Sequence, residues 1–186
     1  PLLYLGGGVI HSGAADVAVS LAEHATLPAV MTLMALGAMP ARHPLALGML
    51  GMHGAPFTNH LIAECDLLVA VGARFDDRAT GRLASFCPQA NVVHIDIDAA
   101  ELNKLRTADV AIAGDVRQVL IELMRTTRPR RRRPWTDRVR RARMEHPLNL
   151  PGHSDVRSPY GLIAAVADAI GDDAVVTTDV GQHQMW

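Results

Sequence analysis

The fold is decided by the stretch Leu67-Leu68-Val69-Ala70-Val71-Gly72-Ala73-Arg74-Phe75-Asp76-Asp77-Arg78, which joins an unbroken apolar run to a glycine and a charge cluster. Five apolar residues closed by Gly72 are typical of a buried parallel strand that ends in a loop. Open α/β sheets bind ligands at the carboxyl ends of their strands. Arg74 and Arg78 can hold phosphate oxygens there, with the two neighbouring aspartates orienting their guanidinium groups. A solvated, self-paired charge cluster is the alternative.

The same rhythm of an apolar strand, a Gly or Asp and a helix recurs along the chain. We expect further strands at residues 1–8, 28–32, 92–98 and 110–113, and helices at residues 14–24, 56–64, 99–105 and 116–124. Asp115 stands before the last of these helices as a candidate N-cap. Strands that alternate with helices favour an α/β fold built around a parallel sheet.

A glycine turn closes the first expected strand. The backbone amides of Gly6-Gly7-Gly8 can approach a phosphate at the start of the following helix. The turn is not a complete G-x-G-x-x-G fingerprint, because His11 occupies the position of the third glycine. A plain tight turn is therefore the alternative.

Other strand ends carry further candidate binding residues. The loop Met49-Leu50-Gly51-Met52-His53-Gly54 places a His between two glycines, which favours backbone close to a ligand, and the apolar loop 33–37 suits a flat ring. Alternation along one strand puts His94, Asp96 and Asp98 on the same face. An acid at a strand end can accept hydrogen bonds from ribose hydroxyls, and a metal held by these three residues is the alternative.

Composition bounds the class of protein. The 186 residues carry 18 Lys and Arg against 19 Asp and Glu, so the whole molecule is not built to bind nucleic acid or an anionic membrane. Cys65 and Cys87 indicate reduced thiols rather than a disulfide framework. No run of about 18 apolar residues and no signal-like leader occurs, so we expect a soluble, cytoplasmic protein.

The composition changes abruptly between residues 125 and 143, where Arg130 to Arg133 are unbroken. A nucleic-acid arm is one interpretation of this tract. Flanking prolines and the near absence of interleaved aromatics instead favour an exposed linker and a solvated helix that join two domains. We place the first domain at residues 1–127, an Arg- and Pro-rich linker at 128–156 and the start of a second domain at 157–186.

The second domain is expected to begin with a helix from Ser158, as N-cap, to about Ile170. A strand at residues 174–178 follows. The chain opens on Pro1 directly before a strand and closes on Trp186 before any helix could cover the last strand. We therefore expect an internal segment of a longer polypeptide.

Five motifs together carry a resemblance to a known family. They are Gly6-Gly7-Gly8, Met49-Leu50-Gly51-Met52-His53-Gly54, Gly72-Ala73-Arg74-Phe75-Asp76-Asp77-Arg78, His94-Ile95-Asp96-Ile97-Asp98 and Val180-Gly181-Gln182-His183-Gln184-Met185-Trp186. In this order they resemble the large, catalytic subunits of acetolactate synthase (acetohydroxyacid synthase). The resemblance extends over nearly the whole chain except the Arg-rich linker.

The resemblance implies a Rossmann-type, three-layer (DHS-like) FAD-binding middle domain, followed by the start of a thiamine-diphosphate-binding α/β domain. Positions that line FAD in the family match Gly6, Gly7, Gly8, Thr32, Leu33, Met34, Leu50, Gly51, Met52, His53, Gly72, Ala73, Arg74, Asp76, Arg78, Asp96, Ile97, Gly114, Asp115 and Val116. The family's loop against thiamine diphosphate matches Val180, Gly181, Gln182 and His183.

The implied activity is the condensation of pyruvate with a second 2-keto acid, pyruvate or 2-ketobutyrate, with loss of carbon dioxide, in isoleucine and valine biosynthesis. The family also implies a homodimer or larger assembly with a small regulatory subunit. Its thiamine-activating glutamate and its Mg²⁺ ligands lie outside the matching region, so we expect no catalytic or metal-binding residue here and no activity from this chain alone. Glyoxylate carboligase, pyruvate oxidase or a free-standing nucleotide-binding module are the alternatives.

Overall fold

The computed structural model describes residues 1–171 and 174–185 and divides the chain into two units, Pro1–Pro147 (unit 1) and Leu148–Trp186 (unit 2). Each unit is described by itself. The domain boundaries drawn from the sequence at 127 and 156 stay predictions.

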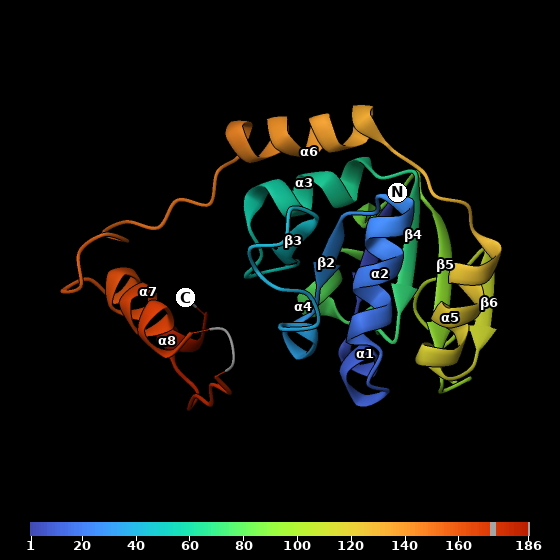
Figure 1. Cartoon of the computed structure of the whole chain (residues 1–186), viewed down its shortest axis with the longest axis horizontal. Coiled ribbons are helices and arrows are strands. Elements are labelled where there is room, and N and C mark those ends of the chain that lie inside the picture. Colours follow the sequence, from blue (N-terminus) through green and yellow to red (C-terminus); the bar gives the residue numbers. More distant parts are fainter. Residues whose placement is uncertain (172–173, 186) are drawn as a thin grey trace. The chain divides into compact units, whose positions relative to one another are not determined.

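In unit 1, where every residue is described, six parallel strands form one sheet in the order β3-β2-β1-β4-β5-β6 (Figure 1). The strands are β1 (Leu2–Leu5), β2 (Ala29–Met31), β3 (Ala46–Met49), β4 (Leu67–Val71), β5 (Asn91–Asp96) and β6 (Val110–Ala113). The chain starts in the middle of the sheet, moves outward to β3 and returns to add β4 on the other side of β1. This reversal makes the β1–β4 boundary the place where an open sheet of this kind offers a binding crevice.

Helices cover both faces of the sheet, so the predicted α/β, three-layer fold is confirmed (Figure 1). One face packs against α1 (Gly7–His11), α2 (Ala15–Ala25) and α5 (Val116–Thr126), and the other against α3 (Pro56–Glu64) and α6 (Arg133–Glu145). Alternation along the strands separates the two cores: Leu3 and Val69 face α2, whereas Leu2, Tyr4 and Leu68 face α3. Three short pieces, η1 (Leu33–Ala35), α4 (Asp77–Thr80) and η2 (Leu83–Ser85), lie in the loops.

The edge strand β3 was not predicted from the sequence. Its four residues include Gly48 at φ 74°, and its pairing with β2 shifts register between Ala29 and Met31. A short, irregular edge strand with an internal glycine carries little of the β-branched, alternating signal by which strands are recognised.

The helix predicted over residues 99–105 is wrong, because this stretch is a series of turns. The carboxylate of Asp98 accepts a hydrogen bond from the Ala100 amide, and Asn103 adopts φ 62° and accepts from the Ala108 amide. Short polar side chains that bond nearby amides compete with helix formation. The preceding strand also ends at Asp96, two residues earlier than predicted.

The Arg-rich segment contains α6, one side of which is buried rather than solvated. Val139 and Ala142 join the core beneath α3, and Arg138 pairs with Glu64 of α3 and with Glu145. Many arginines of this segment therefore belong to an amphipathic helix that packs on the rest of unit 1.

Unit 2 contains α7 (Pro159–Ile170) and α8 (Gln182–Met185). Ser158 caps α7 as predicted, since its hydroxyl accepts from the Gly161 amide at 3.1 Å. The strand predicted at residues 174–178 is wrong: these residues form no regular structure, and Val175 and Val176 are exposed. An isolated strand leaves its backbone groups unpaired, and the described part of unit 2 offers no second strand to pair with it.

Among the described residues, no helix combines the length and apolar character required to cross a membrane.

Candidate functional site

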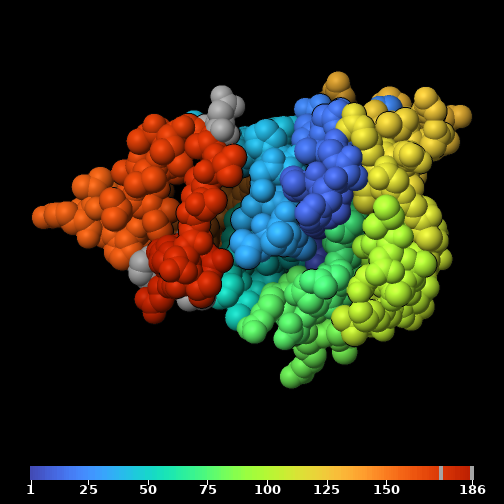
Figure 2. Space-filling model, turned by 90° about the horizontal axis from the view of Figure 1, so that it is seen from below, coloured from blue at the N-terminus to red at the C-terminus, as the bar shows by residue number. Residues whose placement is uncertain are grey.

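The loops that follow the parallel strands gather at one edge of the sheet in unit 1. Figure 2 looks onto this carboxyl edge, where the segments after β1 and β2 (blue to cyan) lie beside those after β4 and β5 (green to yellow-green). All predicted binding residues of unit 1 belong to these loops, to the strand ends that lead into them or to the first turns of the helices that follow. The sheet order therefore brings together residues that are up to about one hundred positions apart in the sequence.

Three glycines close the gap between the loops after β1 and β4. The Gly6 amide donates to Val71 O and the Gly8 amide donates to Gly72 O, both at 3.0 Å. A Cβ on Gly6 would lie 2.1 Å from the Gly72 oxygen, and one on Gly8 would lie 2.7 Å from the Gly72 Cα. Only glycine permits backbones to pack so closely.

This packing changes the role expected for the glycine turn. The amides of Gly6 and Gly8 are already used by strand-end hydrogen bonds, so they are not free to cradle a phosphate. Gly7, the middle residue, lies against the loop after β2, where a Cβ would come 3.1 Å from the Met34 Cβ. The turn thus fixes two loops against each other and leaves ligand contacts to the side chains around it.

The loop after β3 is fixed in the same manner. Gly51 has φ 86°, and a Cβ there would lie 2.2 Å from the Arg78 carbonyl, which accepts the Met52 amide at 3.0 Å. The side chain of Asn59 in α3 bonds both the amide and the carbonyl of Gly51 at 2.9 Å. Sequence reasoning missed Asn59, because nothing in its local pattern reveals a partner in the preceding loop.

The charge cluster after β4 is not self-paired. Asp76 caps α4, accepting from the amides of Arg78 and Ala79 at 3.1 Å each, so its carboxylate does not orient a guanidinium group as predicted. Within unit 1, where every residue is described, no ion pair or hydrogen bond engages the guanidinium groups of Arg74 and Arg78, and both residues are exposed. Two exposed arginines without a partner in unit 1 therefore stand at the carboxyl edge of the sheet.

Exposed apolar side chains lie in the loops that neighbour these arginines at the carboxyl edge. They are Leu33 and Met34 after β2, Met52 after β3 and Ile97 after β5, with exposed fractions from 54% for Leu33 to 73% for Ile97. Thr32, at the end of β2, has a buried hydroxyl without a hydrogen-bond partner in the described structure. Buried polar atoms are nearly always paired, so an unpaired one at a strand end indicates a missing partner.

The acid at the end of β5 is nearly buried, with 9% of its surface exposed. One oxygen of Asp96 accepts the Asp98 amide at 2.9 Å, and its backbone carbonyl accepts the Gly114 amide at 2.9 Å. The second oxygen, Oδ2, accepts no hydrogen bond in the described structure, and it lies 4.0 Å from Nε2 of the buried His94. Gly114 and the start of α5 therefore lie next to Asp96, because β6 pairs with β5. Asp115 is the N-cap of α5, as predicted, and accepts a hydrogen bond from the Gln118 amide.

The metal alternative at this strand end lacks support in the described structure. The imidazole of His94 points to the Ala73 carbonyl, with Nε2 2.9 Å from that oxygen, while Asp98 lies exposed in the loop. No group of three His, Cys, Asp or Glu residues among the described ones is arranged to hold a metal ion.

The remaining predicted residues differ in their exposure or belong to unit 2. His53 is exposed in the loop after β3, and Ala73 and Val116 are buried. Val180, Gly181, Gln182 and His183 belong to unit 2, where Val180 is exposed and α8 begins at Gln182.

The donor set at the carboxyl edge fits a phosphate-bearing cofactor with flat rings. The two free guanidinium groups match phosphate oxygens, the exposed Leu and Met side chains match a ring face, and an oxygen of Asp96 matches a sugar hydroxyl.

Comparison with known proteins gives concordant results. Residues 1–123 match the family model described as thiamine pyrophosphate enzyme, central domain. All 186 residues align with the acetolactate synthase isozyme 1 large subunit of Escherichia coli (strain K12) at 52% identity, covering 33% of that protein. The acetolactate synthase large subunit of Parasynechococcus marenigrum is 49% identical over the whole chain, with 31% of its own length covered, and isozyme 2 of Escherichia coli is 46% identical, with 33% covered. The chain thus spans about a third of the length of these relatives.

Proposed function

The chain belongs to the thiamine pyrophosphate enzyme family, whose central domain its residues 1–123 match, and from this premise we propose that it is the FAD-holding part of an acetolactate synthase large subunit. The names and identities of the relatives support this assignment. We propose further that the whole protein condenses pyruvate with pyruvate or 2-ketobutyrate, with loss of carbon dioxide, in the cytoplasmic synthesis of isoleucine and valine.

One observation carries the FAD proposal. At the carboxyl edge, Arg74 and Arg78 are cationic, exposed and without a partner in the described structure, and the neighbouring loops carry exposed apolar side chains such as Met34 and Met52. Arginine binds phosphate oxygens with strong, directional hydrogen bonds, so the two guanidinium groups would hold the pyrophosphate. The apolar loops would cover a flat ring, and Asp96 and Thr32 would supply polar contacts to the remainder of the cofactor.

The proposed catalytic chemistry depends on a second cofactor. Thiamine diphosphate, bound with Mg²⁺, would act as the electron sink that stabilises the decarboxylated 2-keto acid. Val180, Gly181, Gln182 and His183 of unit 2 are the residues we propose to contact it. We assign no proton transfer and no metal ligand to this chain, and we propose that activity requires a homodimer or larger assembly, with a small regulatory subunit as partner.

FAD binding by the full-length protein tests the proposal. A ligand that binds only the folded state raises the melting temperature by mass action, so FAD should produce a dose-dependent upward shift. Arg74→Ala should weaken FAD binding by about 1 to 3 kcal/mol, the usual range for a charged hydrogen bond.

Arg131→Ala serves as the matched control. Like Arg74→Ala, this variant removes an exposed arginine that has no partner in the described structure. Arg131 follows Arg130, whose amide bonds His24 O near the end of α2, at the opposite edge of the sheet (Figure 1). The control should leave FAD binding unchanged. Absence of any thermal shift with FAD in the full-length protein would disprove the cofactor assignment.

A further inference from the structure

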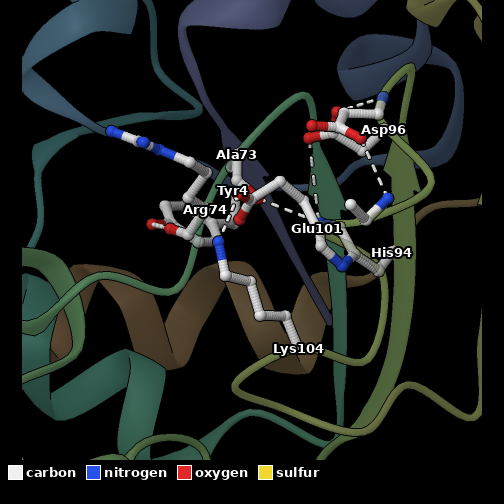
Figure 3. A network of polar contacts seen from close by, with 9 residues as sticks. Tyr4, Ala73, Arg74, His94, Asp96, Glu101 and Lys104 are labelled. Atoms are coloured by element: carbon white, nitrogen blue, oxygen red, sulfur yellow. Dashed lines mark hydrogen bonds and ion pairs between the residues drawn. The ribbon is translucent and has the colours of Figure 1, made fainter.

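Two buried side chains hold consecutive carbonyl oxygens of the loop after β4 (Figure 3). The Tyr4 hydroxyl, from β1, donates to the carbonyl of Arg74 at 2.7 Å, and Nε2 of His94, from β5, lies 2.9 Å from the carbonyl of Ala73. Tyr4 and His94 are both fully buried. Tyr4 was not a binding candidate from the sequence, and His94 was considered only as a metal ligand.

The sheet register explains why these two side chains converge. Tyr4 pairs with Ala70 of β4, and Ala70 pairs with His94 of β5, so the three residues form a row across the same face. The methyl group of Ala70 leaves room above β4 for the loop to fold back between the two larger side chains. Phe75 then closes over the row, with its ring centroid 5.8 Å from that of Tyr4 and 5.1 Å from that of His94.

Both side chains act as hydrogen-bond donors to these carbonyls. A carbonyl can only accept, so the His94 imidazole carries its hydrogen on Nε2, and Nδ1 is left buried without a partner in the described structure. Burial, assisted by the nearby Asp76 carboxylate, raises the pKa of the Tyr4 hydroxyl, although Arg74 opposes this shift. The hydroxyl is therefore a donor throughout the neutral range.

The two contacts fix the direction in which the Arg74 side chain leaves the backbone. The Ala73 carbonyl belongs to the peptide plane before the Arg74 Cα, and the Arg74 carbonyl belongs to the plane after it. Holding both planes limits rotation about the two backbone bonds of that residue and thereby orients its Cα–Cβ bond. In Figure 3 the Arg74 guanidinium extends away from Tyr4 and His94.

No carboxylate in unit 1 orients the Arg74 side chain in place of these two donors. Within unit 1 the Arg74 guanidinium has no ion-pair partner, and the neighbouring Asp76 is engaged as a helix cap. A long, unpaired side chain loses rotamer entropy when it grips a ligand, and a pre-oriented backbone reduces that cost.

From these contacts we propose that Tyr4 and His94 are positioning residues that orient Arg74 toward the pyrophosphate of the dinucleotide cofactor. This inference rests on the proposed function, because it takes FAD as the ligand of Arg74. Neither residue touches the cofactor in this account, and both act through the backbone of Arg74.

A double-mutant cycle in the full-length protein tests the proposal. Tyr4→Phe removes one hydroxyl and retains the ring that packs edge-on against Phe75 and Phe86. It should raise the dissociation constant for FAD about 2- to 10-fold, corresponding to one neutral hydrogen bond. In the Arg74→Ala background the same substitution should change FAD affinity by less than about 2-fold, because the residue it orients is gone.

Thr58→Val is the matched control for a purely structural effect. The Thr58 hydroxyl is also buried and also donates to a carbonyl, that of Leu47, at 2.7 Å. This substitution should lower the melting temperature to a similar extent as Tyr4→Phe and leave FAD affinity unchanged. If Tyr4 contributed only to stability, Tyr4→Phe would leave FAD affinity unchanged, as Thr58→Val does.

His94 provides a second, independent variant pair. The side-chain amide of Gln can donate to the Ala73 carbonyl, whereas Leu cannot. His94→Gln should therefore retain FAD affinity more closely than His94→Leu, even if both lose stability. If Tyr4→Phe does not fold, this pair of His94 variants tests the proposal in its place.

The outcomes separate this inference from the function on which it rests. Failure of the unsubstituted full-length protein to bind FAD would overturn the proposed function and the inference together. FAD binding that weakens with Arg74→Ala but not with Tyr4→Phe or His94→Leu would overturn the inference alone. An equal effect of Tyr4→Phe on FAD affinity in the presence and absence of the Arg74 side chain would also overturn the inference alone.

Discussion

Replacing Gly6 by Ala should strongly destabilise unit 1, because the new methyl group would meet backbone rather than a flexible side chain. Its Cβ would lie 2.1 Å from the Gly72 oxygen and 2.4 Å from the Ala73 Cα. Real Cβ contacts essentially never fall below 3.0 Å, so the loops after β1 and β4 would have to separate by about 1 Å.

Two energetic terms give the magnitude. Separating the loops disturbs the bonds from the Gly6 amide to Val71 O and from the Gly8 amide to Gly72 O, each worth about 0.5 to 1.5 kcal/mol. The steric strain of overpacking adds about 1 to 3 kcal/mol. We therefore expect a loss of about 4 kcal/mol in the free energy of unfolding, a large part of the roughly 5 to 15 kcal/mol typical of a folded domain.

Urea unfolding followed by far-ultraviolet circular dichroism measures this loss. Gly114→Ala is the control, since a Cβ there would meet only the Val119 Cγ2 at 3.4 Å, an ordinary contact with a side chain. The control should stay within about 0.5 kcal/mol of the unsubstituted protein, as most unstrained substitutions do. If Gly6→Ala were as mild as the control, the argument from close backbone packing would be refuted.

Three further predictions concern stability and reactivity. Asp76→Ala should cost about 0.5 to 2 kcal/mol of unfolding free energy, because the two amides that Asp76 caps in α4 would lose their acceptor; an unchanged midpoint in urea would contradict this. The hydrogen bond from Arg138 lowers the pKa of Glu64 below its ordinary value of 4.5, so the pair stabilises the fold above pH 4.5 and loses its effect as the pH falls. The advantage of the unsubstituted protein over Glu64→Gln, about 1 kcal/mol or less for a pair this exposed, should then disappear in unfolding experiments below that pH, and a difference that persists at low pH would argue against the ion pair. Burial raises the pKa of Cys65 to about 12, so mass spectrometry should find this thiol unmodified by iodoacetamide at pH 8 until the protein is unfolded; rapid modification of the native protein would show that the core opens there.

The central strands and their helices were predictable because their signals are local. The run Leu67–Val71 is apolar throughout and ends in glycine, and Asp115 and Ser158 are standard caps at the starts of α5 and α7. The elements that were not predicted correctly carry weaker signals. The strand β3 was missed because it is short and contains a glycine. Residues 174–178 were predicted as a strand but form none, in the absence of a partner strand in the described part of unit 2. Local patterns predict the type of an element better than they predict its partners.

The candidate site was predictable in outline but not in its internal contacts. The sequence indicated that Gly6, Gly72 and Arg74 would stand at strand ends, and the sheet order does bring them together. It did not indicate that the glycine amides bond the neighbouring loop, nor that Asp76 caps a short helix instead of orienting an arginine.

The contacts that hold Arg74 are beyond local prediction for a physical reason. The bond from Tyr4 joins residues 70 positions apart, and the bond from His94 joins residues 21 positions apart. Both depend on the register of three parallel strands, which follows from packing over the whole sheet and not from any short stretch of sequence.

The location of FAD in the full-length protein tests the central claim most directly. A crystal structure of that protein with FAD should show the pyrophosphate at the carboxyl edge between the loops after β1 and β4, with its oxygens about 2.7 to 3.2 Å from the guanidinium nitrogens of Arg74. A structure in which FAD lies away from this edge, or in which Arg74 makes no contact with its phosphates, would contradict the account.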